Sequence, residues 1–258
     1  MDRYRRRSLA VRWGRSRWSL NSDGGYLAVF NDLWSYTPTT GLWTWVGGSN
    51  TPNAAGVYGT QGTAAAGNVP GARMGGSAWV DASGNVWLFG GLGLTQGGLA
   101  QEYSDLWNYN PITGLWSWVG GSDGPDASGV YGTQHAGSAG NGPGARVSAV
   151  SWKDHAGNFW LLGGYGYAQG GLGNLNDLWE YNLGSGVWTW VGGSSSTAVY
   201  GTYGTQGIPA GNNAPGAREQ AVGWLDSSGN FWLFGGFGFD SADVEDDLND
   251  LWRFTQSP

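Results

Sequence analysis

The sequence predicts an all-β fold, a β-propeller built from four-stranded antiparallel blades. One observation is a repeat: the tetrapeptide Asn/Ser-Asp-Leu-Trp occurs four times, and its Asp residues lie 73, 72 and 73 residues apart. A constant period indicates that one structural unit is copied along the chain, with each copy packing on the next. The other observation is composition, because 50 Gly and 18 Trp among 258 residues suit short strands and tight turns and disfavour helices. The four Asp residues are Asp32, Asp105, Asp177 and Asp250.

The first two strands of a repeat are expected to form a hairpin. In the second copy, residues 77–80 lead into the turn 81–85 and then into the apolar run 86–89. The turn has the pattern Asp-x-x-Gly-Asn, which places a Gly where a hairpin turn needs a positive φ. The run after the turn is apolar on both sides, so we expect this strand to be covered on both faces. The turn recurs at 154–158 and 226–230, and the run recurs at 159–162 and 231–234.

The other two strands of a repeat follow a Gly-rich stretch of about a dozen residues. The third strand carries Asp-Leu-Trp, with the Asp expected near its start. The fourth, at 115–119, alternates Trp with a small polar residue, as on a half-exposed outer strand. These strands give a propeller at 31–258, with blade portions at 31–46, 74–119, 147–191 and 219–254. Residues 1–30 form an Arg-rich N-terminal segment, for which a degenerate first repeat is one interpretation.

Two motifs in these blades resemble the Kelch repeat. A Gly-Gly pair follows the second strand, and a Tyr is followed by a Trp with six residues between them. The Gly pairs are 90–91, 163–164 and 235–236, and the Tyr/Trp pairs are Tyr36/Trp43, Tyr109/Trp116 and Tyr181/Trp188. The resemblance implies a Kelch-type propeller over about residues 31–258. Kelch units have about 50 residues, whereas these have 72 or 73, and the surplus lies in the connections between blades.

The long connections, at about 47–72, 120–145 and 192–217, are expected on one face of the propeller, opposite the short turns. All three connections contain the motif Tyr-Gly-Thr-Gln. The Tyr and Gln residues are Tyr58, Gln61, Tyr131, Gln134, Tyr203 and Gln206. On one interpretation they bind a polar ligand with apolar faces, such as a sugar. On the other, Tyr covers the blade and Gln satisfies backbone groups of the loop.

Each connection ends in Pro-Gly-Ala-Arg, and these arginines can meet the aspartates of the repeat. The residues concerned are Arg73, Arg146, Arg218, Asp32, Asp105, Asp177 and Asp250. Hydrogen-bonded ion pairs that lock each blade to its connection are the favoured interpretation. A ring of arginines that binds an anion is the alternative.

The charge distribution limits the partners. Seven of the 12 basic residues lie in the first 17 positions, and the remainder holds four Arg and one Lys against 18 Asp and Glu. Such an acidic body should repel nucleic acid and anionic membranes. The chain has no apolar run near the roughly 20 residues that span a bilayer, and the N-terminal segment lacks the apolar region of a secretory signal. We therefore expect no nucleic-acid partner and no membrane span.

The sequence offers little for catalysis, so we expect no enzyme activity, no cofactor and no metal. Some Kelch-like propellers are oxidases whose copper radical centre needs a Tyr-Cys crosslink, and this chain has 0 Cys. The two histidines, His135 and His155, lie in loops expected on opposite faces. The acidic stretch 240–247 offers oxygens for Ca²⁺ but lacks the EF-hand spacing, and a solvated loop is favoured.

The strand count leaves partial blades at both ends of the sequence. The chain begins with strands three and four of one blade and ends with strands one to three of another. Two such chains could close a six-bladed ring as a homo-oligomer, or the Arg-rich head could supply strands that let one chain close at four blades. The leading hypothesis for function is a non-enzymatic module that binds a carbohydrate or protein ligand through its loop-rich face, outside the cell or on its surface. The alternatives are a structural protein that assembles into rings or fibres, and an enzyme using unique loop residues.

Overall fold

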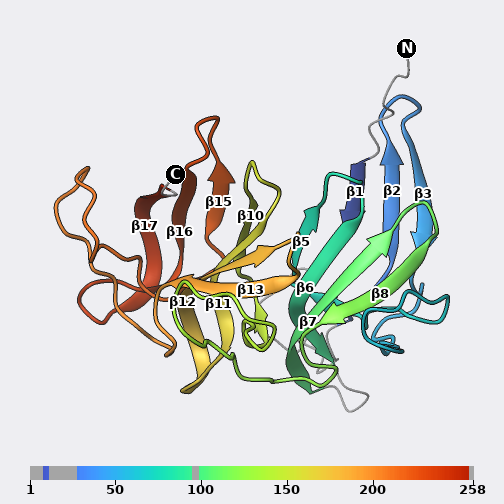
Figure 1. Cartoon of the computed structure of the whole chain (residues 1–258), viewed down its shortest axis with the longest axis horizontal. Coiled ribbons are helices and arrows are strands. Elements are labelled where there is room, and N and C mark those ends of the chain that lie inside the picture. The colour runs from blue at the N-terminus through green and yellow to red at the C-terminus, as the bar shows by residue number, and fades with distance from the viewer. Residues whose placement is uncertain (1–7, 12–27, 95–98, 256–258) are drawn as a thin grey trace, which may run out of the picture.

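The computed structural model describes residues 8–11, 28–94 and 99–255, and within them the fold is all-β and antiparallel (Figure 1). The first sheet contains β1 (Ser8–Val11), β2 (Leu33–Thr37) and β3 (Leu42–Gly47). The second contains β4 (Arg73–Met74), β5 (Ser77–Val80), β6 (Val86–Leu94), β7 (Ala100–Asn110) and β8 (Leu115–Gly120). The third contains β9 (Arg146–Val147), β10 (Val150–Lys153), β11 (Phe159–Ala168), β12 (Gly171–Asn182) and β13 (Val187–Gly192). The fourth contains β14 (Arg218–Glu219), β15 (Val222–Leu225), β16 (Phe231–Phe239) and β17 (Glu245–Phe254).

The predicted hairpins are present in each of the last three sheets, where β5 pairs with β6, β10 with β11 and β15 with β16. The turn glycines Gly84, Gly157 and Gly229 have φ of 82°, 95° and 83°. In the first of these turns, one carboxylate oxygen of Asp81 accepts hydrogen bonds from the backbone N–H groups of Ser83 and Asn85. The turn motif therefore folds as its residues predict. Among the described residues there is no helix, and hence none that could span a membrane.

The Gly-rich stretch after each apolar run belongs to the strands. β6 continues through Gly90 and Gly91, whose φ values are 61° and 102°, and its pairing with β7 shifts by one residue there. A β-carbon on Gly90 would lie 2.8 Å from the carbonyl oxygen of Tyr103, so only Gly fits this bulge. As a result β7 already begins at Ala100, and Asp105 lies in its middle. The prediction that the Asp lies near the start of the third strand was wrong for Asp105, Asp177 and Asp250, and it is confirmed for Asp32, which directly precedes β2.

The core lies between successive sheets. Trp79 of the second sheet stacks on Phe159 of the third, with ring centroids 5.1 Å apart and planes 13° apart. Its indole N–H donates to the carbonyl oxygen of Trp152, which is 73 residues further on, at 2.8 Å. Trp152 in turn stacks on Phe231 of the fourth sheet at 5.2 Å. The same aromatic contact thus recurs from one sheet to the next, as a repeat architecture requires.

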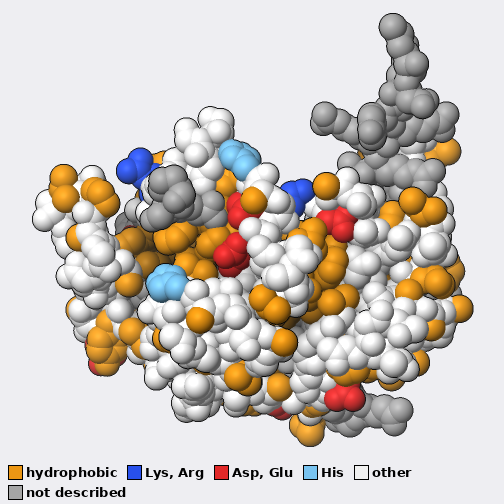
Figure 2. All heavy atoms as spheres, viewed as in Figure 1, with side chains coloured by type: hydrophobic (Ala, Val, Ile, Leu, Met, Phe, Trp, Pro, Cys, Tyr) orange, Lys and Arg blue, Asp and Glu red, His pale blue; other side chains and the backbone are white. Residues whose placement is uncertain are grey.

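The first and fourth sheets lie at opposite ends of the molecule (Figure 1). Burial decreases toward the C-terminal end: the apolar run of β11 is wholly buried, whereas Phe234 in the equivalent run of β16 is 46% exposed. Figure 2 shows hydrophobic side chains that reach the surface among the C-terminal strands. The prediction that these runs are covered on both faces is confirmed for β11. It was wrong for β16, because no further described sheet packs against that side of the fourth sheet.

Candidate functional site: the Arg-Asp-Tyr clusters and the open terminal sheets

A buried ion pair joins each long connection to the third strand of the sheet that follows. In the third sheet, Arg146 Nη1 and Nη2 donate to the two carboxylate oxygens of Asp177 at 2.6 and 2.7 Å. The same guanidinium donates to the carbonyl oxygens of Gly144 and Gly163, each at 3.0 Å. The two side chains are 1% and 0% exposed. Arg73 pairs with Asp105 and Arg218 with Asp250 in the same way.

A Tyr and a Trp complete each cluster. Tyr131 Oη and Trp179 Nε1 each donate to Oδ2 of Asp177 at 2.7 Å. The Tyr131 ring lies against Trp179 and Trp190, with centroid distances of 5.0 and 5.2 Å. Burial, and then the charge of Asp177, raises the pKa of Tyr131 far above its ordinary value. The phenol therefore remains a protonated hydrogen-bond donor, which suits a structural cluster and not a catalytic base.

The residues expected on a ligand-binding face take part in this packing. Tyr58 donates to Asp105 at 2.8 Å, and Tyr203 donates to Asp250 at 2.7 Å. Gln61 and Gln134 donate from their side-chain amides to the carbonyl oxygens of Val119 and Val191, each at 3.1 Å. The structure therefore assigns these Tyr and Gln side chains internal contacts. Gln206, the third Gln, is exposed.

Backbone hydrogen bonds also hold the first two connections against the outer strand of the sheet that follows. Gly62 N donates to the carbonyl oxygen of Trp118 on β8 at 2.7 Å. His135 N, at the equivalent position of the next connection, donates to that of Trp190 on β13 at 2.8 Å. The outer strands are consequently half-buried, and Trp188 on β13 is only 7% exposed. These bonds were missed from the sequence. The sequence contains three copies of the loop motif, but only two of them are followed by an outer strand. This count would have indicated that one loop lacks a strand to bond to.

The fourth sheet has the connection but, among the described residues, not the outer strand. The Tyr203 ring packs on Trp252 at 4.9 Å, with no second Trp of the kind that contacts Tyr58 and Tyr131. Gly207 N, which corresponds to Gly62 N, has no acceptor within the described part of the chain. No described strand pairs with the outer edge of β17.

The first sheet shows the opposite deficit. Its outer strand β3 is present but uncovered, with Trp43 and Trp45 57% and 48% exposed. Asp32 Oδ2 accepts from Trp34 Nε1 at 2.6 Å, as in the other clusters. Its Oδ1, which in the other three copies accepts from an arginine, is buried and has no partner among the described residues. The sequence had placed Asp32 in an ion pair, and within the described chain it has none.

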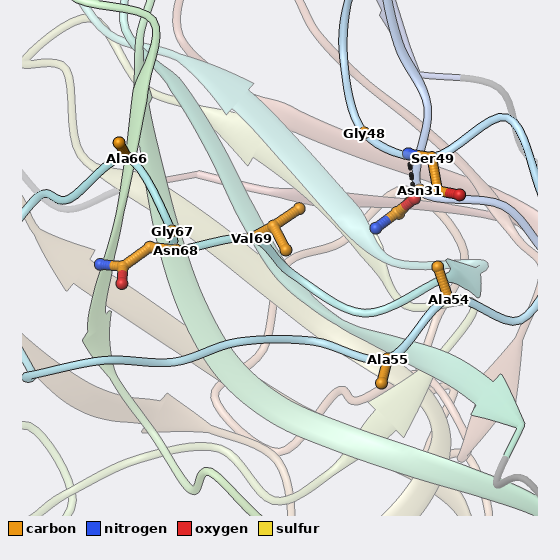
Figure 3. A pocket seen from close by; sticks show the side chains of 9 residues that line it. All are labelled: Asn31, Gly48, Ser49, Ala54, Ala55, Ala66, Gly67, Asn68 and Val69. Carbon is orange, nitrogen blue, oxygen red and sulfur yellow. Dashed lines mark hydrogen bonds between the residues drawn. The ribbon is translucent and has the colours of Figure 1, made fainter.

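A surface hollow beside the first connection is another candidate site. A hollow of about 360 Å³ lies beside the first connection, lined by Asn31, Gly48, Ser49, Ala54, Ala55, Ala66, Gly67, Asn68 and Val69. Figure 3 shows the hydrogen bond between Ser49 N and Asn31 Oδ1 at one end of it; the Asn31 amide also donates to the Pro70 carbonyl at 3.0 Å. Its polar side chains are thus already engaged.

The acidic stretch 240–247 is divided between a turn and a strand. Asp240 Oδ1 accepts from the N–H groups of Ala242 and Val244, and residues 245–247 belong to β17. His135 and His155 are both exposed. Across the described ranges, His, Asp and Glu form no group of three that could hold a metal ion.

One buried carboxyl was not singled out from the sequence. Glu102, on β7, is 4% exposed, and burial raises its pKa from 4.5 to about 7, with nearby Asp126 acting in the same direction. The repeat gives no signal for Glu102, because Asn174 and Asp247 occupy the corresponding positions in the third and fourth sheets. Each of the three residues pairs with the residue that directly follows the Gly-Gly pair of the neighbouring strand.

Stability is expected to fall as the pH rises from about 4.5 to 7. In this window folded Glu102 holds its proton more tightly than the unfolded chain does, so the folded state binds more protons and deprotonation favours unfolding. Glu102→Gln should remove this dependence and raise the free energy of unfolding at pH 8 by up to about 3 kcal/mol. Urea unfolding at pH 5 and pH 8 measures both effects. Asp123→Asn, the same charge change at an exposed residue, is the control, and an equal gain in that variant would contradict the prediction.

Comparison with known proteins assigns no family. No family model matches the chain, and no curated protein is similar to it. Among solved structures the chain is similar to YjhT, with 15% identity over 85% of this chain and 59% of that one and a TM-score of 0.45. The chain therefore spans less than two thirds of the length of that structure.

Proposed function

We propose that this protein is a non-enzymatic interaction module, built from Kelch-type propeller repeats, that associates with protein partners through its two terminal sheets. The observation that carries this proposal is the contrast between equivalent outer strands. β8 and β13 are each bonded to a connecting loop, whereas residues 42–46 of β3 are exposed, Trp43 and Trp45 among them, and no described loop bonds to this strand. Exposed aromatic side chains on an unpaired strand edge are typical of protein-binding surfaces.

The contacts made by the repeat motifs support the Kelch-type part of the proposal. The Tyr and Trp of each motif lie on neighbouring strands, with ring centroids 5.0 Å apart for Tyr109 and Trp116 and 5.1 Å apart for Tyr181 and Trp188. The Gly-Gly pair forms the bulge of the second strand. Both motifs therefore have scaffold roles, which leaves binding to surfaces outside them.

The terminal sheets are a better candidate for binding than the loop-rich face. The Tyr hydroxyls of the loops are bonded to aspartates, and two of the three Gln amides are bonded to backbone carbonyls. A ligand would have to displace these contacts. The self-assembly expected as an alternative from the sequence agrees with the proposal, since an open sheet edge can be completed by another strand.

We expect Trp43→Lys to weaken association of the protein. The purified chain should show a concentration-dependent mass above its 27.2 kDa in sedimentation equilibrium. Because Trp43 is 57% exposed on β3, its replacement should raise the dissociation constant by about 30-fold while the chain still folds. Ile112→Lys, a similar change at a turn residue that is 89% exposed, should leave the constant within about threefold. A wild-type chain that stays at the single-chain mass up to about 100 μM, a concentration at which weak edge contacts form, would overturn the proposal.

A further inference from the structure

We propose that the partner is a second copy of this chain, and that the two copies associate by exchanging strands. In this arrangement, which rests on the proposed function, β2 and β3 of one copy replace β17 of the other beside β16. Each copy would give its first sheet and receive that of its partner. The fourth sheet would then gain an outer strand, and the outer strand β3 of the first sheet would be covered, through the same contact.

The fourth sheet contributes an acceptor site for an outer strand. Its connection presents Gly207 N, Ala210 N and the Gln206 amide at the positions from which the first connection bonds to β8. None of these three groups has an acceptor within the described residues. The Tyr203 ring contacts Trp252 but no Trp of an outer strand. The geometry therefore fits a strand with the pattern Leu-Trp-x-Trp-Val-Gly.

The first sheet contributes the matching strand pair. β3 has the sequence Leu-Trp-Thr-Trp-Val-Gly, and Trp43, Trp45 and Val46 stand 73 residues before Trp116, Trp118 and Val119. Gly207 and Gln206 would donate to the carbonyl oxygens of Trp45 and Val46. Trp34 of β2, and Asp32 directly before this strand, stand at the repeat positions of Trp252 and Asp250. The orphaned Oδ1 of Asp32 would then accept from Arg218 of the second copy.

In the single chain, the edge of β2 that β16 of a second copy would occupy is paired with the short strand β1. β1 pairs with β2 through four residues, and the pair Val11 with Leu33 has the same register as Phe234 with Leu251 and Phe89 with Leu106. β1 thus stands where a full second strand would pair. β16 pairs with β17 through eight residues and continues beyond a Gly-Gly bulge. Replacement of β1 by β16 of a second copy would give β2 the kind of partner strand that β6 is for β7, and β17 would be released from β16 in exchange.

Crosslinking at two exposed positions tests the exchange directly. The chain has 0 Cys, so Gln206→Cys with Val46→Cys introduces the only two thiols. Both side chains are exposed in the single chain, and exchange brings them together across the two copies, as Gln61 and Val119 are within one copy. A short bis-maleimide should give a covalent dimer on a denaturing gel. Gln134→Cys with Val46→Cys is the control and should give none, because Gln134 is held at Val191. No crosslink, or a crosslink within one chain, would overturn the proposal.

Substitutions at two equivalent aspartates should act in opposite directions. Asp32→Ala removes the acceptor for Arg218 in the exchanged dimer only, and should raise the dissociation constant by about 100-fold. Asp250→Ala removes the acceptor in the single chain only, and should lower the constant. Equal effects of the two variants would contradict strand exchange. If the wild-type chain associates but neither the crosslink nor this opposition appears, the exchange fails and the interaction module stands. If it does not associate at all, both fail.

Discussion

Asp177→Ala is expected to lower the free energy of unfolding by about 3–5 kcal/mol. The substitution leaves the guanidinium of Arg146, which is 1% exposed, without a counter-charge. It also removes the acceptor for Tyr131 Oη and Trp179 Nε1, so two further buried donors lose their partner. The aspartate is the common acceptor of its cluster, and its loss therefore costs more than that of a single hydrogen bond.

Guanidinium chloride unfolding followed by Trp fluorescence measures this effect, and the repeat supplies the control. Asp32 occupies the same position in the first sheet but holds no described arginine, so Asp32→Ala should cost the single chain less than about 1 kcal/mol, measured at a protein concentration too low for copies to associate. The double variant Arg146→Met with Asp177→Leu should recover much of the loss, since it removes the uncompensated charge. If Asp177→Ala and Asp32→Ala have the same cost, the ion pair does not contribute as described.

Features that depend on local residue patterns could be predicted from the sequence. The turn Asp-x-x-Gly-Asn specifies its own hairpin, because Gly84 supplies a positive φ and Asp81 accepts from the turn backbone. The spacing of Tyr109 and Trp116 places them on adjacent strands. The pairing of arginines with aspartates followed from their once-per-repeat occurrence. Each of these features is decided within one repeat.

Features that depend on neighbouring repeats could not be predicted. The start of β7 at Ala100 follows from a bulge at Gly90, where the partner strand and the next sheet both approach closely. The sequence around Tyr131 is compatible with binding a sugar and with bonding to an aspartate. Its burial against the following sheet decides in favour of the aspartate. Glu102 is buried in the second sheet, and the third sheet has Asn174 at the corresponding position, so the repeat pattern does not mark it. The open edges likewise depend on which segments cover the terminal strands.

The distribution of polar side chains explains why association is assigned to the ends of the array. In the third sheet, Arg146, Asp177 and Tyr131 satisfy one another and leave no donor or acceptor for a ligand. Within the described residues, the same cluster in the first sheet consists of Asp32 and Trp34. Of the four repeated aspartates, only Asp32 has a buried carboxylate oxygen without a partner among the described residues. The proposed association is therefore placed at the terminal sheets, where this acceptor and the exposed strand β3 lie.

Gly144→Ala is expected to lower the free energy of unfolding by about 3 kcal/mol. Gly144 precedes the strand that carries Arg146, and Tyr167 N bonds to the adjacent Ala145 carbonyl at 2.8 Å. A β-carbon on Gly144 would overlap the carbonyl oxygen of Tyr167 and would lie 2.6 Å from Gly129 N. Both contacts are with backbone, so neither can be relieved by rotating a side chain. The shift would also disturb the Gly144 carbonyl that accepts from Arg146.

Gly71 holds the same place in the Pro-Gly-Ala-Arg motif of the first connection and provides a matched comparison. Among the described residues, the nearest atom to a β-carbon there would be Gly56 N at 3.0 Å, so Gly71→Ala should cost about 1 kcal/mol or less. Gly216, whose added β-carbon would overlap the Phe239 carbonyl oxygen, should behave like Gly144. Chemical unfolding of the three variants gives the order. Because the motif is identical in all three copies, any difference must arise from the strand packed above it, and equal costs would refute that explanation.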